Sequence, residues 1–180
     1  MTRHLPTLAA AALALLPAAP LAAAELDARY EEMGRMQVTL DGETTELIIP
    51  YDRESDRPYA EQTRIMDSYL TINSVGRKLA ETGMLIRPMV QVTLQRQDGE
   101  MRLLSAEMFD NQGFDAPLAM GMDGGEGELV SFSLEEGHLE ARVEGEFLRL
   151  ESYMKEPQVA EGATPVPVTI DWTAEIAPLD

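Results

Sequence analysis

Hydrophobic and polar residues alternate with a period of two along much of the chain. The segment MQVTLDGETTELIIP places Met36, Val38 and Leu40 on one face, reaches Asp41-Gly42 and then alternates again. Two alternating runs separated by Asp-Gly are typical of a β-hairpin with a two-residue turn. The same pattern predicts two more hairpins, over 90–109 with a turn at Asp98-Gly99 and over 129–152 with a turn at Glu136-Gly137.

The segment VPVTIDWTAEI near the C-terminus has the most regular alternation in the chain and predicts a final strand. Val168, Ile170, Trp172 and Ala174 share one face of it. Because the side chains of a strand point alternately to its two faces, these four residues should turn to the same side. We therefore expect Trp172 to be buried between two sheets.

Three further segments carry weaker signals. Apolar residues of both parities over 62–76 predict a strand that is covered on both faces. Residues 77–84 predict either one or two helical turns closed by Gly83 or an ordinary loop. In the third hairpin, the alternation is disturbed near Gly145, which indicates a β-bulge.

These elements predict an all-β protein. A hairpin with one apolar and one polar face must cover its apolar face, and two antiparallel sheets packed face to face do this economically. We therefore expect an antiparallel β-sandwich of about seven to nine strands, with a β-barrel as the second choice. Residues 25–180 have the length of one domain, so we expect a single β-sandwich domain.

The N-terminal residues 1–24 predict a secretory signal peptide. Arg3 and His4 precede an apolar stretch that prolines interrupt and that ends in the small residues Ala22-x-Ala24. A membrane-spanning helix would need about 20 consecutive apolar residues. We therefore expect cleavage after Ala24, a mature chain in the periplasm or secreted, and no direct membrane insertion.

The charge of the chain excludes some partners. It has 32 acidic residues against 14 Lys and Arg, a formal net charge of −18, and no cysteine. A field of this sign repels phosphate backbones and anionic lipid headgroups, so we expect no nucleic-acid binding. Solubility, attraction of cations or steering of a basic partner remain as interpretations of the acidity.

Most catalytic motifs are absent from the sequence. His138 is the single histidine after the leader, and no G-x-S-x-G elbow accompanies it. We interpret it as a solvent-facing residue beside the Glu136-Gly137 turn. One histidine and no cysteine argue against zinc, and no phosphate-binding loop is present. A carboxylate-pair hydrolase stays open because acidic residues are numerous.

Residues 109–128, FDNQGFDAPLAMGMDGGEGE, are the strongest metal candidate in the sequence. Calcium takes oxygen ligands, and this segment offers carboxylates at Asp110, Asp115, Asp123, Glu126 and Glu128. Their spacing differs from that of an EF-hand, so we expect a mobile connection that at most binds calcium weakly. Residues 119–127 would then be dispensable for folding.

Methionines in the same segment suggest a second, less favoured metal. Met120-x-Met122 offers thioether sulfurs of the kind that bind Cu(I), although two sulfurs alone make an incomplete site. The remaining methionines at strand positions are interpreted as core residues: Met36, Met89, Met101 and Met108.

The segment 51–69 combines aromatic and basic residues in an otherwise acidic chain. Tyrosine and arginine are enriched at the centres of protein interfaces. We therefore predict a surface for a protein partner from Tyr51, Arg53, Arg57, Tyr59 and Tyr69, with Arg64 nearby.

Together these features predict an exported, monomeric, non-catalytic binding or accessory protein of the bacterial-type envelope. The alternative is a metal-dependent protein, with calcium preferred over copper, or a carboxylate-pair hydrolase that uses residues 109–128.

Overall fold

The computed structural model describes residues 24–65, 69–153 and 156–179, so most of the predicted signal peptide lies outside the described residues. The described residues form twelve β-strands and no helix. The strands are β1 (Tyr30–Leu40), β2 (Glu43–Asp52), β3 (Arg57–Pro58), β4 (Ala60–Ile65), β5 (Tyr69–Leu79), β6 (Leu85–Gln97), β7 (Glu100–Phe109), β8 (Leu118–Gly121), β9 (Gly127–Glu135), β10 (His138–Ser152), β11 (Gln158–Val159) and β12 (Val166–Glu175).

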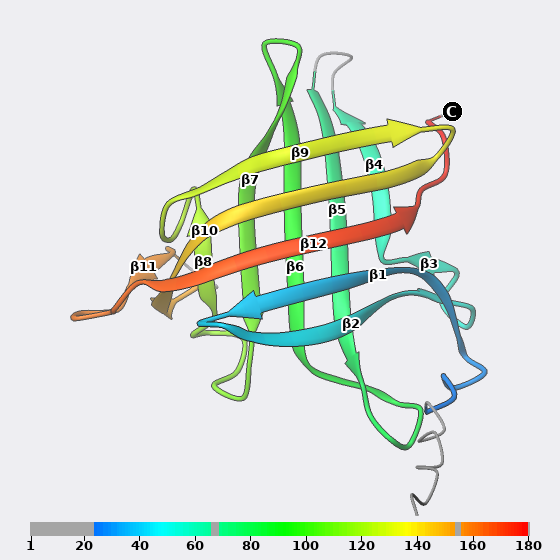
Figure 1. Cartoon of the computed structure of the whole chain (residues 1–180), viewed down its shortest axis with the longest axis horizontal. Coiled ribbons are helices and arrows are strands. Elements are labelled where there is room, and N and C mark those ends of the chain that lie inside the picture. Colours follow the sequence, from blue (N-terminus) through cyan, green and yellow to red (C-terminus); the bar gives the residue numbers. More distant parts are fainter. Residues whose placement is uncertain (1–23, 66–68, 154–155, 180) are drawn as a thin grey trace, which may run out of the picture.

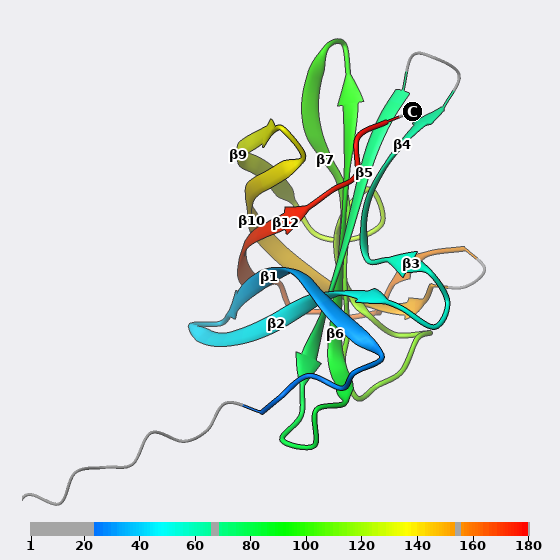
Figure 2. The same cartoon turned by 90° about the vertical axis from the view of Figure 1, so that its right-hand side faces the viewer.

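The strands lie in two layers that cross each other. Figure 1 shows β9, β10, β12, β1 and β2 side by side in the front layer, and β7, β6, β5 and β4 running across them behind. All pairings between these strands are antiparallel. Figure 2 shows the same two layers from the side, with residues 24–29, which precede β1, lying below β2.

The two layers are parts of one sheet that is partly closed on itself. The long strand β10 pairs with β12 in the front layer and, through Leu148 and Arg149, with β8 at the border of the back layer. A second junction pairs Ile48 of β2 with Arg77 of β5. The fold is therefore all-β and sandwich-like or barrel-like, as the sequence predicts. The strand count exceeds the expected seven to nine partly because β3 and β11 have only two residues each.

The three predicted hairpins are confirmed, including their turns. Each joins its strands through two residues, the first of which has positive φ although it is not glycine: 48° at Asp41, 52° at Asp98 and 52° at Glu136. Glycine follows in each case, with positive φ as well. Two consecutive left-handed residues match the twist of the flanking strands, which explains why Asp-Gly and Glu-Gly stand at these positions.

The core lies between the layers and confirms the register predicted for the last strand. Trp172 is 3% exposed, and its predicted neighbours Val168, Ile170 and Ala174 are buried beside it. Its indole Nε1 donates a hydrogen bond of 3.1 Å to the hydroxyl of Ser74 on β5. This bond links the front layer to the back layer through the core.

Three local predictions are wrong. The segment 62–76 is not one strand, because β4 and β5 form a hairpin in which Ile65 pairs with Tyr69. Of the two alternatives for 77–84, the helix is wrong and the loop holds only from Ala80, because residues 77–79 continue β5. The irregularity between β9 and β10 falls between Arg142 and Val143, so the bulge is not at Gly145.

None of the described residues forms a helix that is long and apolar enough to cross a membrane.

Candidate functional site

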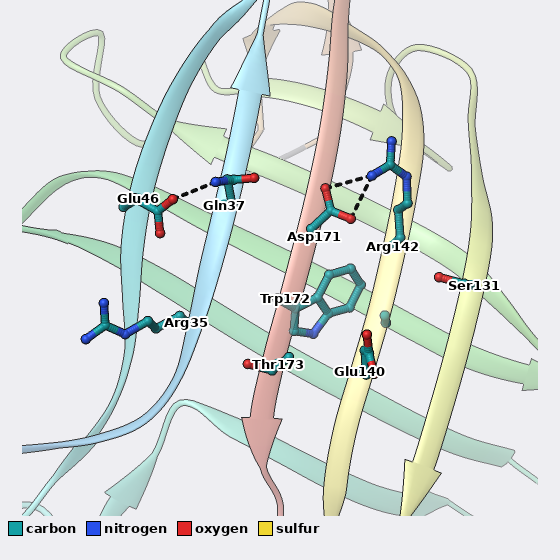
Figure 3. A pocket seen from close by; sticks show the side chains of 10 residues that line it. Arg35, Gln37, Glu46, Ser131, Glu140, Arg142, Asp171, Trp172 and Thr173 are labelled. Carbon is teal, nitrogen blue, oxygen red and sulfur yellow. Dashed lines mark hydrogen bonds and ion pairs between the residues drawn. The ribbon is translucent and has the colours of Figure 1, made fainter.

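The outer face of the front layer carries a shallow hollow of about 260 Å³, shown in Figure 3. Most of its charged side chains already have a polar partner. Arg142 lies 2.9 Å from Asp171 and 2.6 Å from Glu144, and Gln37 donates a hydrogen bond of 2.6 Å to Glu46. Because these groups already satisfy each other, the hollow offers few free groups to a ligand.

A different groove, of about 220 Å³, lies on the outer face of the back layer. Val75 of β5 and Met89 of β6 supply apolar surface, and Asn73 and Gln91 supply side-chain amides on the same two strands. The complete lining consists of Arg57, Pro58, Tyr59, Glu61, Asn73, Val75, Met89, Gln91 and Phe114. Met89 therefore lies on the outer face and not in the core, contrary to the sequence-based expectation.

Two arginines beside this groove lie over aromatic rings. The Arg57 guanidinium is 5.6 Å from the ring centroid of Tyr59, and that of Arg87 is 4.8 Å from the ring centroid of Phe114. Within the described part of the chain, neither arginine forms an ion pair with a carboxylate. Six other arginines do form such pairs: Arg29, Arg35, Arg53, Arg102, Arg142 and Arg149. The groove thus has free guanidinium groups in an acidic protein.

The structure separates the five residues that the sequence predicts for a partner surface. Arg57 and Tyr59 line the groove. The Tyr51 hydroxyl group donates a hydrogen bond to Asp56, and Arg53 forms an ion pair with Glu31. Tyr69, which is 49% exposed, begins β5 at the far end of the β4–β5 ladder. Arg64 is exposed on β4.

A network of ion pairs beside Tyr51 holds the end of β2. Asp52, which is almost fully buried, lies 2.5 Å from Arg29 and accepts hydrogen bonds from the backbone of Glu54 and Ser55. The hydrogen bond from Arg29 lowers the pKa of Asp52 well below its usual range, against the opposing effect of burial. This network stabilises the corner and leaves little of it free for a partner.

Residues 109–128 are not one long connection, contrary to the prediction. The strand β8 lies within them, and backbone hydrogen bonds hold the turn that follows: Gly121 N to Gly125 O at 2.8 Å, and Gly125 N to Ala119 O at 3.0 Å. A Cβ atom on Gly124 would lie 2.1 Å from the Ala119 carbonyl oxygen. The glycines here permit close backbone packing, a role that loop composition alone did not reveal.

The predicted metal-binding carboxylates do not converge. Asp110 forms an ion pair of 2.6 Å with Arg149, while Asp115, Glu126 and Glu128 are exposed. Among the described residues, no group of three or more Asp, Glu, His or Cys side chains has the geometry to hold a metal ion. Two of the five, Glu126 and Glu128, line a hollow of about 600 Å³ together with Glu144 and Glu146 of β10.

The methionine and histidine candidates have separate environments. Met120 is fully buried in the core, whereas Met122 is 70% exposed, so the structure does not bring the two sulfurs together. His138 is exposed beside its turn, as predicted, with Nδ1 2.7 Å from Oε1 of Glu175.

The sequence-based reasoning missed Glu107, the most unusual carboxyl group of the described chain. Glu107 is 3% exposed although it lies on the outer face of β7. Burial raises its pKa to about 7, the neighbouring Ser105 hydroxyl opposes that shift, and the charge of Asp123 adds to it. Burial also raises the pKa of Tyr153, and the charges of Glu107 and Asp123 contribute. The alternation of apolar and polar residues predicted a strand over 100–109. Nothing in that pattern indicated that its outer face is covered.

In comparisons with protein-family models, curated protein sequences and solved structures, nothing matches this chain.

Proposed function

We propose that this protein is an exported, non-catalytic binding protein, and that the groove on the outer face of its back layer holds an extended, acidic segment of a partner protein. The observation that carries the proposal is the pair of arginines, Arg57 and Arg87, which lie over aromatic rings beside the groove without a carboxylate partner in the described residues.

The size of the groove favours part of a macromolecule over a complete small ligand. Pockets for drug-sized molecules usually have about 300–1,000 Å³, whereas this groove has about 220 Å³. Such a volume accommodates one or two side chains of a segment that continues across the surface.

The lining matches the chemistry of such a segment. The amides of Asn73 and Gln91 can both donate to and accept from a peptide backbone, and Val75 and Met89 offer apolar contact. A guanidinium group binds a carboxylate through charge-assisted hydrogen bonds. Arg57 in the lining and Arg87 over the lining residue Phe114, against the single carboxylate Glu61 of the lining, therefore favour an Asp or Glu side chain of the partner.

The composition of the groove supports binding in preference to catalysis. Its lining residues include one carboxylate, Glu61, and no serine, cysteine or histidine. A nucleophile with a neighbouring base, or a pair of carboxylates, is the usual requirement for hydrolysis. The export half of the proposal rests on the signal-peptide pattern of residues 1–24.

Selection of displayed peptides tests the groove. Immobilised mature protein would select from a random peptide library, and the selected peptides would be titrated against the parent and three variants. We expect peptides that combine Asp or Glu with an apolar residue. Their Kd should rise about tenfold or more in Arg57→Gln and Arg87→Gln, which lose a charge-assisted contact.

Arg102→Gln is the matched control because it makes the same change in net charge at an exposed position of β7, away from the groove. The parent and this control should bind equally well. Selected peptides without acidic residues, or equal Kd values in all four proteins, would refute the proposed groove.

A further inference from the structure

A second groove, of about 480 Å³, lies beside the strand β2 and is called the β2 groove below. Residues 44–48 of β2 form one of its walls, and Ala24 and Leu26 of the N-terminal segment line it as well. Figure 2 shows that segment below β2. The complete lining consists of Ala24, Leu26, Glu32, Arg35, Thr44, Thr45, Glu46, Leu47, Ile48, Lys78 and Leu79. Its volume lies within the usual range of ligand pockets, about 300–1,000 Å³.

The hairpin geometry shows which backbone groups of β2 point toward this groove. In a hairpin with a two-residue turn, the residues next to the turn form a hydrogen-bonded pair, and Glu43 therefore bonds to β1. Hydrogen-bonded pairs alternate with pairs that are not bonded to each other. Thr45 and Leu47 consequently bond to β1 as well, whereas the backbone N–H and C=O groups of Thr44 and Glu46 point away from β1.

The pairing of Ile48 supports this assignment. Ile48 follows the same alternation as Thr44 and Glu46, and it pairs with Arg77 of β5 on the side away from β1. Thr44 and Glu46 pair with β1 alone, and their backbone groups enter no turn or loop hydrogen bond of the described chain. Both residues are exposed. This part of β2 is therefore a free edge, to which another extended chain can add.

The free edge of β9 is less suited to such an addition. β9 pairs only with β10, and Val130 is an extra residue in that pairing, which makes a β-bulge. A bulge bends an edge strand away from a new partner. β2 has an unbroken register with β1 from Glu43 to Ile49.

Most charged side chains of the β2 groove already have a polar partner. Glu32 forms an ion pair of 2.7 Å with Arg35, and Glu46 accepts a hydrogen bond of 2.6 Å from Gln37. These contacts leave Lys78 as the charged group of the lining that is open to a ligand.

Lys78 is exposed near the end of β5, and no ion pair joins it to a carboxylate of the described residues. The acidic residues outside the described ranges are Asp67 and Asp180. Asp67 precedes the opposite end of β5, and Asp180 follows shortly after Ala177, whose carbonyl group binds Gln62 of β4. The ammonium group of Lys78 thus offers a positive charge to a ligand in the β2 groove.

We propose that the β2 groove binds an extended segment of a partner protein, which adds to the free edge of β2 as a further β-strand and places an Asp or Glu side chain at Lys78. Main-chain hydrogen bonds supply affinity in this mode of binding, and side-chain contacts supply specificity. Leu26 and Leu79 offer apolar contact beside the carboxylate. The β2 groove shares no residue with the groove of the back layer, so the two proposals stand or fall separately.

Selection of displayed peptides tests this site independently of the other groove. The bait is a mature protein that carries Arg57→Gln and Arg87→Gln, which disable the groove of the back layer. We expect peptides with an Asp or Glu beside apolar residues. Their Kd should rise about threefold to tenfold in Lys78→Gln. It should stay unchanged in Arg96→Gln, which makes the same change of charge at an exposed position near the far end of β6.

A proline on the free edge tests strand addition itself. Glu46→Pro removes an outward N–H group and leaves the hydrogen bonds to β1 in place, and an edge strand tolerates proline at such a position. Glu46→Ala is the matched control, because it removes the same side chain and keeps the N–H group. The Kd of the selected peptides should rise about tenfold or more in Glu46→Pro, and Glu46→Ala should bind no more weakly than the parent.

Hydrogen exchange gives a readout that needs no substitution at the edge. In the protein alone, the amides of Thr44 and Glu46 should exchange fast, whereas those of Thr45 and Leu47 should exchange slowly because they bond to β1. A bound peptide should slow exchange at Thr44 and Glu46 about tenfold or more. This measurement decides the question even if Glu46→Pro does not fold.

Other occupants of the edge would produce different results. Slow exchange at Thr44 and Glu46 in a precursor that retains residues 1–24, but not in the mature protein, would assign the β2 groove to the leader. Slow exchange in a mature protein that sediments as a dimer would assign it to a second copy. Either result would overturn the proposal. So would a failure to select peptides, or equal Kd values in the parent, Lys78→Gln and Glu46→Pro.

Discussion

At the scale of single residues, Trp172 and Asp52 show how buried polar atoms are satisfied in this protein. The indole N–H of Trp172 donates a hydrogen bond to Ser74 across the core. The carboxylate of Asp52 accepts hydrogen bonds from Arg29 and from two backbone N–H groups. Buried donors and acceptors that lack such partners cost stability. Both residues therefore make testable contributions to the free energy of unfolding.

For Trp172, we expect replacement by alanine to lower the free energy of unfolding by about 3–5 kcal/mol, because it opens a cavity and leaves Ser74 without its partner. Trp172→Phe should cost less, since most of the volume remains. Urea denaturation measures both, and Thr173→Ala on the exposed face is the control. A Trp172→Ala protein as stable as the parent would contradict the packing described.

For Asp52, we expect a dependence on pH. A carboxyl group whose pKa is lowered in the folded state stabilises the fold above its unfolded pKa, and that contribution is lost as the pH falls through the folded value. Asp52→Asn should therefore be less stable than the parent at pH 7. The gap should narrow below about pH 4, where the carboxyl group of the unfolded chain begins to take up its proton, and close as the pH approaches the lower pKa of the folded state.

The control for Asp52 is Asp98→Asn, which makes the same change of charge in an exposed turn. Urea midpoints of the three proteins across this pH range measure the effect. A gap between Asp52→Asn and the parent that stays constant from pH 7 into the acid range would contradict the assignment.

At the scale of elements, glycine is required where two backbone segments lie too close together to admit a Cβ atom. The two pairings of Gly145, with Val168 of β12 and Gly127 of β9, are both regular. A Cβ atom at this position would nevertheless lie 2.3 Å from the carbonyl oxygen of Glu126. The glycine therefore serves packing between β10 and the turn before β9.

Gly145→Ala should destabilise the protein by about 1–3 kcal/mol, because the backbone of the turn must shift to admit the methyl group. Glu146→Ala, at the adjacent exposed position, should stay within about 0.5 kcal/mol of the parent. Thermal melting compares the two variants. Similar melting temperatures would contradict the prediction, because they would show that the backbone of the turn shifts at little cost in stability.

Deletion of residues 119–127 should prevent folding. The deletion removes most of β8, which pairs with both β7 and β10 where the two layers join. Circular dichroism in the far and near ultraviolet should therefore show loss of the folded state. A deletion variant with the parent spectrum would restore the view of this segment as a dispensable connection.

At the scale of the whole molecule, the chain shortly after the predicted cleavage site is tied to the fold by a backbone hydrogen bond. Asp27 N donates a hydrogen bond of 3.1 Å to Gly83 O in the turn between β5 and β6. We expect export with cleavage after Ala24, so that the mature chain starts at Glu25. Intact-mass measurement of the exported protein checks this, and a mass that includes residues 1–24 would contradict it.

Local patterns of the sequence determined the strands and their turns. Alternation located the three hairpins and the face of Trp172, because the two-residue period of a strand is a property of neighbouring residues alone. Asp-Gly and Glu-Gly located the turns for the same reason, since positive φ is a local demand on the backbone. The all-β class follows from these elements.

Only the tertiary structure decided which surfaces are free and which are covered. Arg53 and Arg57 look alike in the sequence, but the fold pairs the first with Glu31 and places the second at the groove. Glu107 occupies an outward strand position, yet the fold buries it, and the ring of Tyr153 from beyond β10 packs against Phe109 two residues further along β7. The availability of a charge depends on contacts between residues far apart in the chain, and a local pattern of polarity carries no information about them.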